Sequence, residues 1–321
     1  MNKFNHVSPT TLDDAAAALA KGNALVIAGG TDLISTLHNG ILASGPDTVI
    51  DLKTIANLDY IKEEGGMLKI GALTRLQDIA DSSVVQANYA ALAQAAGRTA
   101  SPHIREMGTI GGNICQYPRC WYFRKQDDRF NCIRKGGNMC YAVAGDNRYH
   151  SIFGGIKACF AVNPSDTAPA LVALNAKIVT TKQTIDAEKF WDVAVPGSTV
   201  LAAGEIVKEI QVPTPATGVK SAFIKFAIRK SIDFPIVNCA AMIGGGDARI
   251  CLNAVYNTPK RVTAAEDAIK GNAITDSSAA AAGAAAVTGA IALPANGSNP
   301  GNKWKIQVAQ ALVTKTVLAC K

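Results

Sequence analysis

The sequence predicts an α+β protein whose last third forms a separate sheet covered by helices. Short apolar runs of strand length and alanine-rich helical segments are mixed over the first two thirds of the chain. Several strand-like runs then precede three helical ones, which is the arrangement expected of an α+β domain. With 321 residues, the chain has ample material for a hydrophobic core.

The N-terminal residues predict a helix, a strand and a turn, in that order. Ser8–Asp14 has the hydroxyl and acidic residues of a helix start, and this helix should run to about Ala20. Ala24–Ala28 is a short buried strand, followed by the first glycine turn (Gly29-Gly30-Thr31-Asp32) and a helix from Leu33. Such a turn presents backbone N–H groups to a phosphate, although a tight turn without a ligand has the same pattern.

A second glycine turn lies at Gly108–Asn113, after further short elements. We expect a strand at 48–52, a hairpin at 60–71, and helices at 74–79 and 87–96. Two turns that could each bind a phosphate indicate a dinucleotide ligand more strongly than a single such turn would. Neither turn reads G-x-G-x-x-G, so the fingerprint of nicotinamide enzymes is absent.

The remainder of the chain predicts strands and then helices. Asp166 can cap the segment that follows it. We expect strands at 177–181, 206–212, 221–229, 235–243 and 249–256, and helices at 264–269, 277–291 and 304–319. These elements suggest three domains, at 1–57, 58–219 and 220–321.

The segment 115–171 contains five of the eight cysteines and has no helical or alternating period. An irregular loop of this length inside a compact domain is improbable unless something holds it. Thiolates on a metal centre would hold it. The four candidate ligands have the spacing C-x11-C-x7-C-x18-C and are Cys120, Cys132, Cys140 and Cys159.

Three explanations of these cysteines remain open from spacing alone. Thiols that are free or joined by disulfides are one, although a chain of this length needs no disulfides for stability. Zinc is the second, although its usual C-x2-4-C pairs are missing. An iron–sulfur cluster is the third, and it tolerates scattered cysteines. Of the four histidines, we expect His150 to be a loop residue whose side chain bonds to the backbone.

Composition excludes several classes of function. The formal net charge is +7, but no Lys/Arg block is dense enough, and aromatic residues are too few at 6%, to indicate nucleic-acid binding. The N-terminus lacks an apolar signal-peptide core, and no run is long and apolar enough to span a bilayer. We therefore expect a cytoplasmic protein with reduced thiols, periplasmic only if a signal-bearing partner subunit carries it there.

Four short segments together resemble the FAD-binding medium subunit of the molybdenum hydroxylases, the xanthine dehydrogenase and aldehyde oxidoreductase family. The segments are residues 28–33, 100–105, 109–113 and 164–166, and the resemblance covers nearly the whole chain in order. Roughly forty extra residues at about 115–160 look like the insertion of periplasmic-type aldehyde oxidoreductase and 4-hydroxybenzoyl-CoA reductase medium subunits, which binds a [4Fe–4S] cluster. We call this segment the insertion.

The resemblance implies a fold, two cofactors and their ligands. The fold would be a two-part FAD-binding domain of the vanillyl-alcohol-oxidase (PCMH) type, followed by the C-terminal α+β domain. The implied cluster ligands are Cys120, Cys132, Cys140 and Cys159, with Cys115 left out. The implied FAD residues are Ile27, Ala28, Gly29, Gly30, Thr31, Asp32, Ile104, Thr109, Gly112, Asn113, Asp166 and Lys225.

The resemblance also implies an electron-transfer role, with no catalytic residue toward the organic substrate in this chain. The partners would be a large subunit with the molybdenum cofactor, a small subunit with [2Fe–2S] clusters, and an external electron acceptor. The substrate would be an aldehyde or an N-heterocycle. Two alternatives are a medium subunit of a 4-hydroxybenzoyl-CoA reductase-type enzyme and a scaffold subunit that binds zinc.

Overall fold

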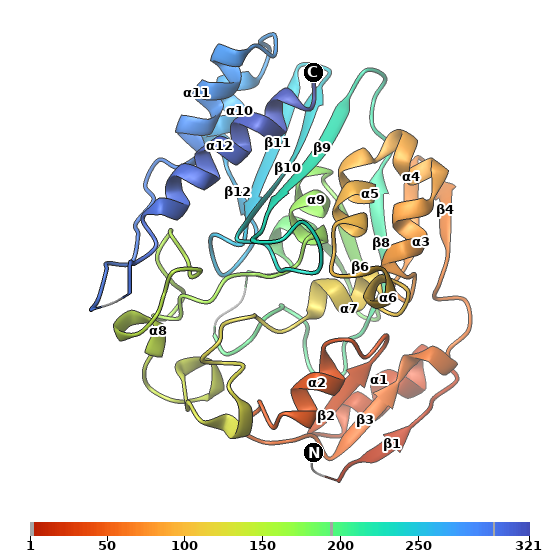
Figure 1. Ribbon diagram of the computed structural model, residues 1–321. Coiled ribbons are helices and arrows are strands. Elements are labelled where there is room, and N and C mark those ends of the chain that lie inside the picture. Colours follow the sequence, from red (N-terminus) through yellow and green to blue (C-terminus); the bar gives the residue numbers. More distant parts are fainter. Residues whose placement is uncertain (1–2, 193–194, 298) are drawn as a thin grey trace.

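The computed structural model describes residues 3–192, 195–297 and 299–321, which form three sheets with helices between and around them (Figure 1). This mixture of helices and sheets confirms the α+β class. Within these ranges, no helix is long and apolar enough to cross a membrane.

The N-terminal part is a small parallel sheet. Helices connect its strands, because parallel neighbours need a crossover. The Thr11 hydroxyl accepts a hydrogen bond from the Asp14 N–H at 3.1 Å, which fixes the predicted start of the first helix. The sheet order is β1 (Asn5–Val7), β3 (Thr48–Asp51), β2 (Ala24–Ile27), and the helices are α1 (Leu12–Ala20) and α2 (Leu33–His38).

The second sheet is antiparallel and contains the predicted hairpin. In order, its strands are β4 (Ile61–Glu64), β5 (Met67–Gly71), β8 (Val207–Pro213), β6 (Lys177–Thr180) and β7 (Thr184–Asp186). The helices of this part are α3 (Leu76–Asp81), α4 (Ser83–Asn88), α5 (Ala90–Gly97), α6 (Pro102–Arg105), α7 (Ile110–Cys115) and α9 (Thr167–Ala173). The segment 87–96, predicted as one helix, is thus divided between α4 and α5 at Tyr89.

The C-terminal sheet separates two hydrophobic cores. Alternate residues of its strands face opposite sides: Ala240 belongs to the core shared with α5 and α9, whereas Cys239 and Ala241 belong to the core under the last three helices. In order, the strands are β12 (Lys260–Arg261), β11 (Asp247–Asn253), β10 (Val237–Gly244) and β9 (Lys220–Phe226). The covering helices are α10 (Thr263–Ile269), α11 (Asp276–Ala286) and α12 (Trp304–Leu318).

The insertion lies between α7 and α9 and has little regular structure, in agreement with the irregular loop predicted there. Its regular elements are single turns: η2 (Gln126–Asp128), η3 (Ile133–Lys135) and α8 (Tyr141–Ala144). Figure 1 shows it along one side of the molecule, between α2 and the C-terminal helices. We propose domain limits at 57 and 219, since the first sheet ends before 57 and the third begins at Lys220.

Candidate functional site

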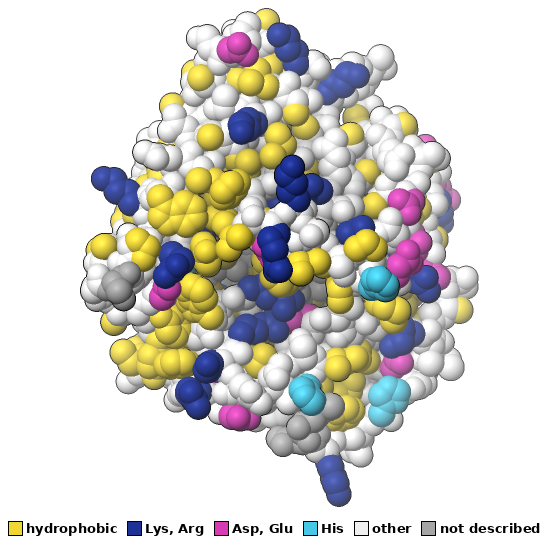
Figure 2. All heavy atoms as spheres, in the orientation of Figure 1, with side chains coloured by type: hydrophobic (Ala, Val, Ile, Leu, Met, Phe, Trp, Pro, Cys, Tyr) yellow, Lys and Arg dark blue, Asp and Glu magenta, His cyan; other side chains and the backbone are white. Residues whose placement is uncertain are grey.

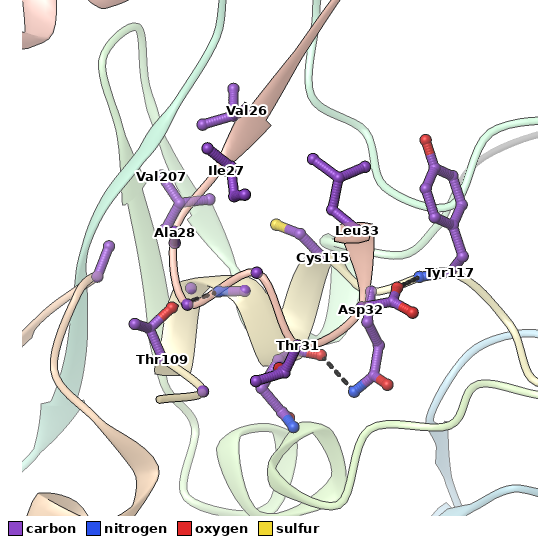
Figure 3. A pocket seen from close by; sticks show the side chains of 18 of the residues that line it. Val26, Ile27, Ala28, Thr31, Asp32, Leu33, Thr109, Cys115, Tyr117 and Val207 are labelled. Atoms are coloured by element: carbon purple, nitrogen blue, oxygen red, sulfur yellow. Dashed lines mark hydrogen bonds between the residues drawn. The ribbon is translucent and has the colours of Figure 1, made fainter. Parts of the chain in front are cut away.

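A cavity of about 830 Å³ opens between the N-terminal sheet, α7 and the segment 201–207 (Figure 3). Its volume is within the range of ligand sites, about 300–1,000 Å³. Basic side chains gather near the centre of the face shown in Figure 2. The cavity is lined by all but one of the predicted FAD residues: Ile27, Ala28, Gly29, Gly30, Thr31, Asp32, Ile104, Thr109, Gly112, Asn113 and Asp166.

The first glycine turn leaves its backbone donors free toward the cavity. Gly30 has a φ of 72°, a left-handed conformation that favours glycine. In the part of the chain that the structure describes, none of the four N–H groups of Gly29–Asp32 donates a hydrogen bond to a protein acceptor. Successive free N–H groups at a turn are what an anionic phosphate requires.

Asp32 faces the insertion. Its carboxylate accepts hydrogen bonds from the Tyr117 N–H at 3.0 Å and from the Arg124 guanidinium at 2.7 Å. Arg119 forms an ion pair with the same carboxylate at 2.8 Å. Arg124 also donates to the Thr36 hydroxyl on α2 at 2.9 Å. Asp32 therefore fastens the insertion to the first glycine turn, a role that the sequence did not indicate.

The second glycine turn is the first turn of a helix rather than an open loop. Thr109 caps α7 by accepting from the Gly112 N–H at 3.1 Å, and the Gly111 N–H donates to the Ala72 carbonyl at 2.9 Å. A Cβ on Gly111 would lie 2.9 Å from that carbonyl oxygen, which explains the glycine. This turn packs on the second sheet, and the N–H groups of Gly111 and Gly112 are used within the protein.

Asp166 lies in the cavity wall, but Lys225 does not. The Lys225 ammonium is 2.7 Å from one Asp166 carboxylate oxygen, and the Asn238 amide donates to the other at 2.8 Å. Both charged side chains are only 3% exposed. Burial raises the pKa of Asp166 to about 6, although Lys225 and Asn238 act in the opposite direction. Lys225 therefore does not line the cavity itself but holds the carboxylate of Asp166, which does.

Asn113 is held by two hydroxyl groups. Its side-chain oxygen accepts hydrogen bonds from Ser165 at 2.5 Å and from Thr167 at 2.7 Å. Both donors flank Asp166, and so this network fixes α7 against the start of α9. Asn113 and the two residues that flank Asp166 therefore form a buried polar network beside the cavity.

The four predicted cluster ligands gather in the insertion, and all are free thiols. Cys120 lies between two small apolar clusters, one containing Cys132 and the other Cys159. Burial raises the pKa of Cys120 to about 12, and the nearby Cys159 and Cys140 thiolates add to this effect. Burial likewise raises the pKa of Cys140, to which Cys159 and Cys132 contribute. Each of the four thiols is therefore close enough to another to feel its charge.

No mononuclear metal site is present in the described ranges. Among those residues, no three His, Cys, Asp or Glu side chains are grouped so that they could hold a metal ion. This finding supports neither a zinc site nor the [4Fe–4S] cluster, and both stay predictions. A [4Fe–4S] cube places each thiolate on a different iron and thus needs four thiols spread around a larger space.

His150 lies beside a predicted cluster ligand, in addition to the backbone contact expected of it. Its Nε2 lies 3.2 Å from the Cys120 sulfur, and the Asn147 backbone is close to the ring. Its other ring nitrogen, Nδ1, is buried and has no side-chain partner among the described residues. The contact itself could not be predicted from a local pattern, because the two side chains are thirty residues apart in the chain.

Comparison with known proteins identifies the family. Residues 2–215 match the family model described as the FAD binding domain in molybdopterin dehydrogenase, and residues 222–320 match that of the CO dehydrogenase flavoprotein C-terminal domain. The chain belongs to the FAD-binding subunits of the molybdopterin dehydrogenases. It is accordingly an oxidoreductase subunit.

Individual members of this family are similar to the chain over most of its length. The aldehyde oxidoreductase FAD-binding subunit PaoB of Escherichia coli (strain K12) is 33% identical over 83% of this chain and 86% of its own. The nicotinate dehydrogenase FAD-subunit of Eubacterium barkeri is 28% identical over 78% and 72%, respectively. The structure of carbon monoxide dehydrogenase from Hydrogenophaga pseudoflava matches with a TM-score of 0.76 and 27% identity, over 99% of this chain and 97% of that one.

The cavity fits the FAD of this subunit family. The first glycine turn offers unpartnered N–H groups for a pyrophosphate, and the cavity is large enough for a ligand of considerable size. Sequence reasoning missed part of the lining: the segment 201–207, and Arg119 with Phe234. The Arg119 guanidinium stacks on the Phe234 ring with its central carbon 4.3 Å from the ring centre. No local pattern distinguishes these residues, because each reaches the cavity only through the tertiary fold.

Proposed function

We propose that this chain is the FAD- and [4Fe–4S]-containing electron-transfer subunit of a molybdenum hydroxylase that oxidises an aldehyde or an N-heterocycle. The similarity to an aldehyde oxidoreductase subunit and to a nicotinate dehydrogenase subunit supports this substrate class. The partners would be a large subunit with the molybdenum cofactor, a small [2Fe–2S] subunit and an external electron acceptor. The compartment would be the cytoplasm, or the periplasm if a partner subunit carries the signal.

One observation carries the proposal: the insertion that contains the four free thiols is joined to the flavin cavity at Asp32. Arg119 and Arg124 belong to the insertion, and both bind Asp32 of the first glycine turn. An insertion joined in this way to the cavity is well placed to exchange electrons with a bound flavin.

The flavin would occupy the cavity described above. Ile27, Ala28 and the first glycine turn would surround the pyrophosphate, and Thr109, Gly112 and Asn113 would close on the phosphates and the ribityl chain from the other side. Asp166 would bind the adenosine half, with Lys225 holding its carboxylate, and Ile104 would pack near the flavin ring. When bound, FAD supplies the redox chemistry, while the protein supplies orientation and electrostatic tuning.

The cluster would be held by Cys120, Cys132, Cys140 and Cys159. Thiolates bind iron, whereas burial keeps the Cys120 and Cys140 thiols protonated in the metal-free protein. Cluster binding would therefore release these protons. Cys115 lies on α7 and lines the flavin cavity, and so it is not included among the ligands.

The test is metal and sulfide analysis of anaerobically purified protein, together with paramagnetic resonance after reduction. We expect about four irons and four sulfides per chain, and loss of the four-iron signal when any proposed ligand is changed to Ser. Cys115→Ser is the control and should retain its iron. Wild-type protein that contains zinc or no metal would remove the cluster from the proposal. A four-iron signal that survives in Cys159→Ser but is lost in Cys115→Ser would show a wrong ligand assignment.

A further inference from the structure

The contact between His150 and Cys120 is buried and isolated. His150 is 3% exposed, and its Nε2 lies 3.2 Å from the Cys120 sulfur. The rings of Trp121 and Tyr122 flank the imidazole, with centroids at 6.3 and 6.1 Å. Nδ1 is buried and makes no side-chain hydrogen bond within the described residues, and the Asn147 backbone lies beside the ring.

The C-terminal helix holds this histidine in place. The His150 carbonyl accepts hydrogen bonds from the Asn302 amide and from the Lys305 ammonium, both at 3.1 Å. Lys305 is fully buried and also donates to the Tyr149 carbonyl. The His150 N–H donates to the Asn147 carbonyl at 2.9 Å. The His150 backbone is thus held partly from within the insertion, by Asn147, and partly by the C-terminal domain, which contains none of the four thiols.

The chemical roles of the two groups change when the thiol becomes a ligand. A free thiol can donate a hydrogen bond, but a thiolate on iron can only accept one. A ring that carries its proton on Nε2 donates to that thiolate whether the imidazole is neutral or cationic. Hydrogen bonds to cluster sulfurs are among the factors that set the reduction potential, because they stabilise the more negative, reduced state.

We infer that His150 is a positioning and tuning residue: it donates a hydrogen bond from Nε2 to the Cys120 thiolate and raises the reduction potential of the [4Fe–4S] cluster. This inference rests on the proposed function, since it requires the cluster. Its effect is to make the cluster a better electron acceptor than the same four cysteines would produce alone.

The experiment compares variants of the full complex by redox titration followed by paramagnetic resonance. His150→Leu removes the donor, His150→Gln retains an N–H, and His6→Leu is a control at an exposed histidine of β1. We expect the equilibrium constant for one-electron reduction of the cluster to fall about tenfold in His150→Leu. This corresponds to a reduction potential that is lower by about 59 mV. His150→Gln should restore much of this loss, and His6→Leu should leave the potential unchanged.

A second measurement covers the case in which His150→Leu fails to assemble. Pulsed resonance of the reduced wild-type cluster should detect an exchangeable proton coupling from His150, in addition to those of the Tyr122 and Phe123 N–H groups that also bond to the Cys120 sulfur, and this one coupling should be absent in any His150→Leu cluster. A four-iron cluster with unchanged potential in His150→Leu would overturn the inference and leave the proposed function intact, as would a wild-type cluster without this coupling. Absence of iron from the wild type would instead refute the proposed cluster itself.

Discussion

Replacing Lys225 by Met should destabilise the protein by leaving the Asp166 carboxylate buried without its cation. The two charged groups are 2.7 Å apart, and both side chains are 3% exposed. Removing one partner of a buried ion pair costs about 3–5 kcal/mol, because the remaining charge is uncompensated. The Asn238 amide remains as a donor to the other oxygen, and so the lower part of this range is expected.

The loss should depend on pH, and the direction follows from Asp166. Burial raises its pKa to about 6 in the folded protein, whereas an unfolded aspartate titrates near ~3.9. At pH values between these two pKa values, the folded state binds a proton that the unfolded state has released. The stability of the folded protein therefore falls as the pH rises toward and through 6. Relative to Asp166→Asn, wild type should lose roughly 3 kcal/mol of stability between pH 4 and pH 8.

The assay is urea denaturation followed by circular dichroism at pH 5 and pH 8. Lys225→Met should lose much more free energy of unfolding at pH 8 than at pH 5, where Asp166 is protonated and neutral. The double variant with Asp166→Asn contains no buried charge and should recover most of the loss. Equal losses at the two pH values, or a double variant as unstable as Lys225→Met, would refute the reasoning.

Two further predictions concern the flavin cavity. Gly30→Ala and its control Gly65→Ala each place a side chain on a residue with positive φ, at 72° and 61°, and each should cost about 1–2 kcal/mol of stability. Only Gly30→Ala should also reduce the FAD content of the purified protein, measured by absorbance after denaturation. Arg124→Met removes a hydrogen bond to Asp32 and should weaken FAD binding about tenfold, or ~1.4 kcal/mol, in a fluorescence titration. Arg148→Met, which breaks an exposed ion pair, is the control; equal FAD affinity in both arginine variants would contradict the coupling.

The strand, turn and helix around Gly30 could be predicted because their signals are local. Apolar runs, by contrast, did not predict where elements end. The strand predicted to Arg229 stops at Phe226, and Ile228 beyond it is 70% exposed. The helix predicted to Ile291 stops at Ala286, because the Ile291 N–H bonds instead to the Ile152 carbonyl of the insertion.

In the candidate site, too, only features with a local sequence signal could be predicted. The composition of the second glycine turn was visible, but its helical form depends on the Ala72 carbonyl, which lies 39 residues earlier than Gly111 in the chain. The partners of Asp166 and Asp32 are likewise distant in sequence: 59 residues separate Asp166 from Lys225, and 92 separate Asp32 from Arg124. Charge pairs of this kind leave no periodic trace, and so their positions follow only from the folded chain.

The insertion cannot be removed or transferred to another protein independently of its contacts with the rest of the chain. It contributes the arginines that neutralise Asp32, and it contributes two of the three carbonyls that receive the fully buried Lys305 ammonium. Excising it would leave the partly buried Asp32 carboxylate without its two arginines, and it would leave Lys305 with the Ala254 carbonyl alone of its three acceptors, so both sites would be destabilised. Attempts to delete this segment, or to graft it onto a relative that lacks it, must therefore exchange Asp32 and Lys305 along with it.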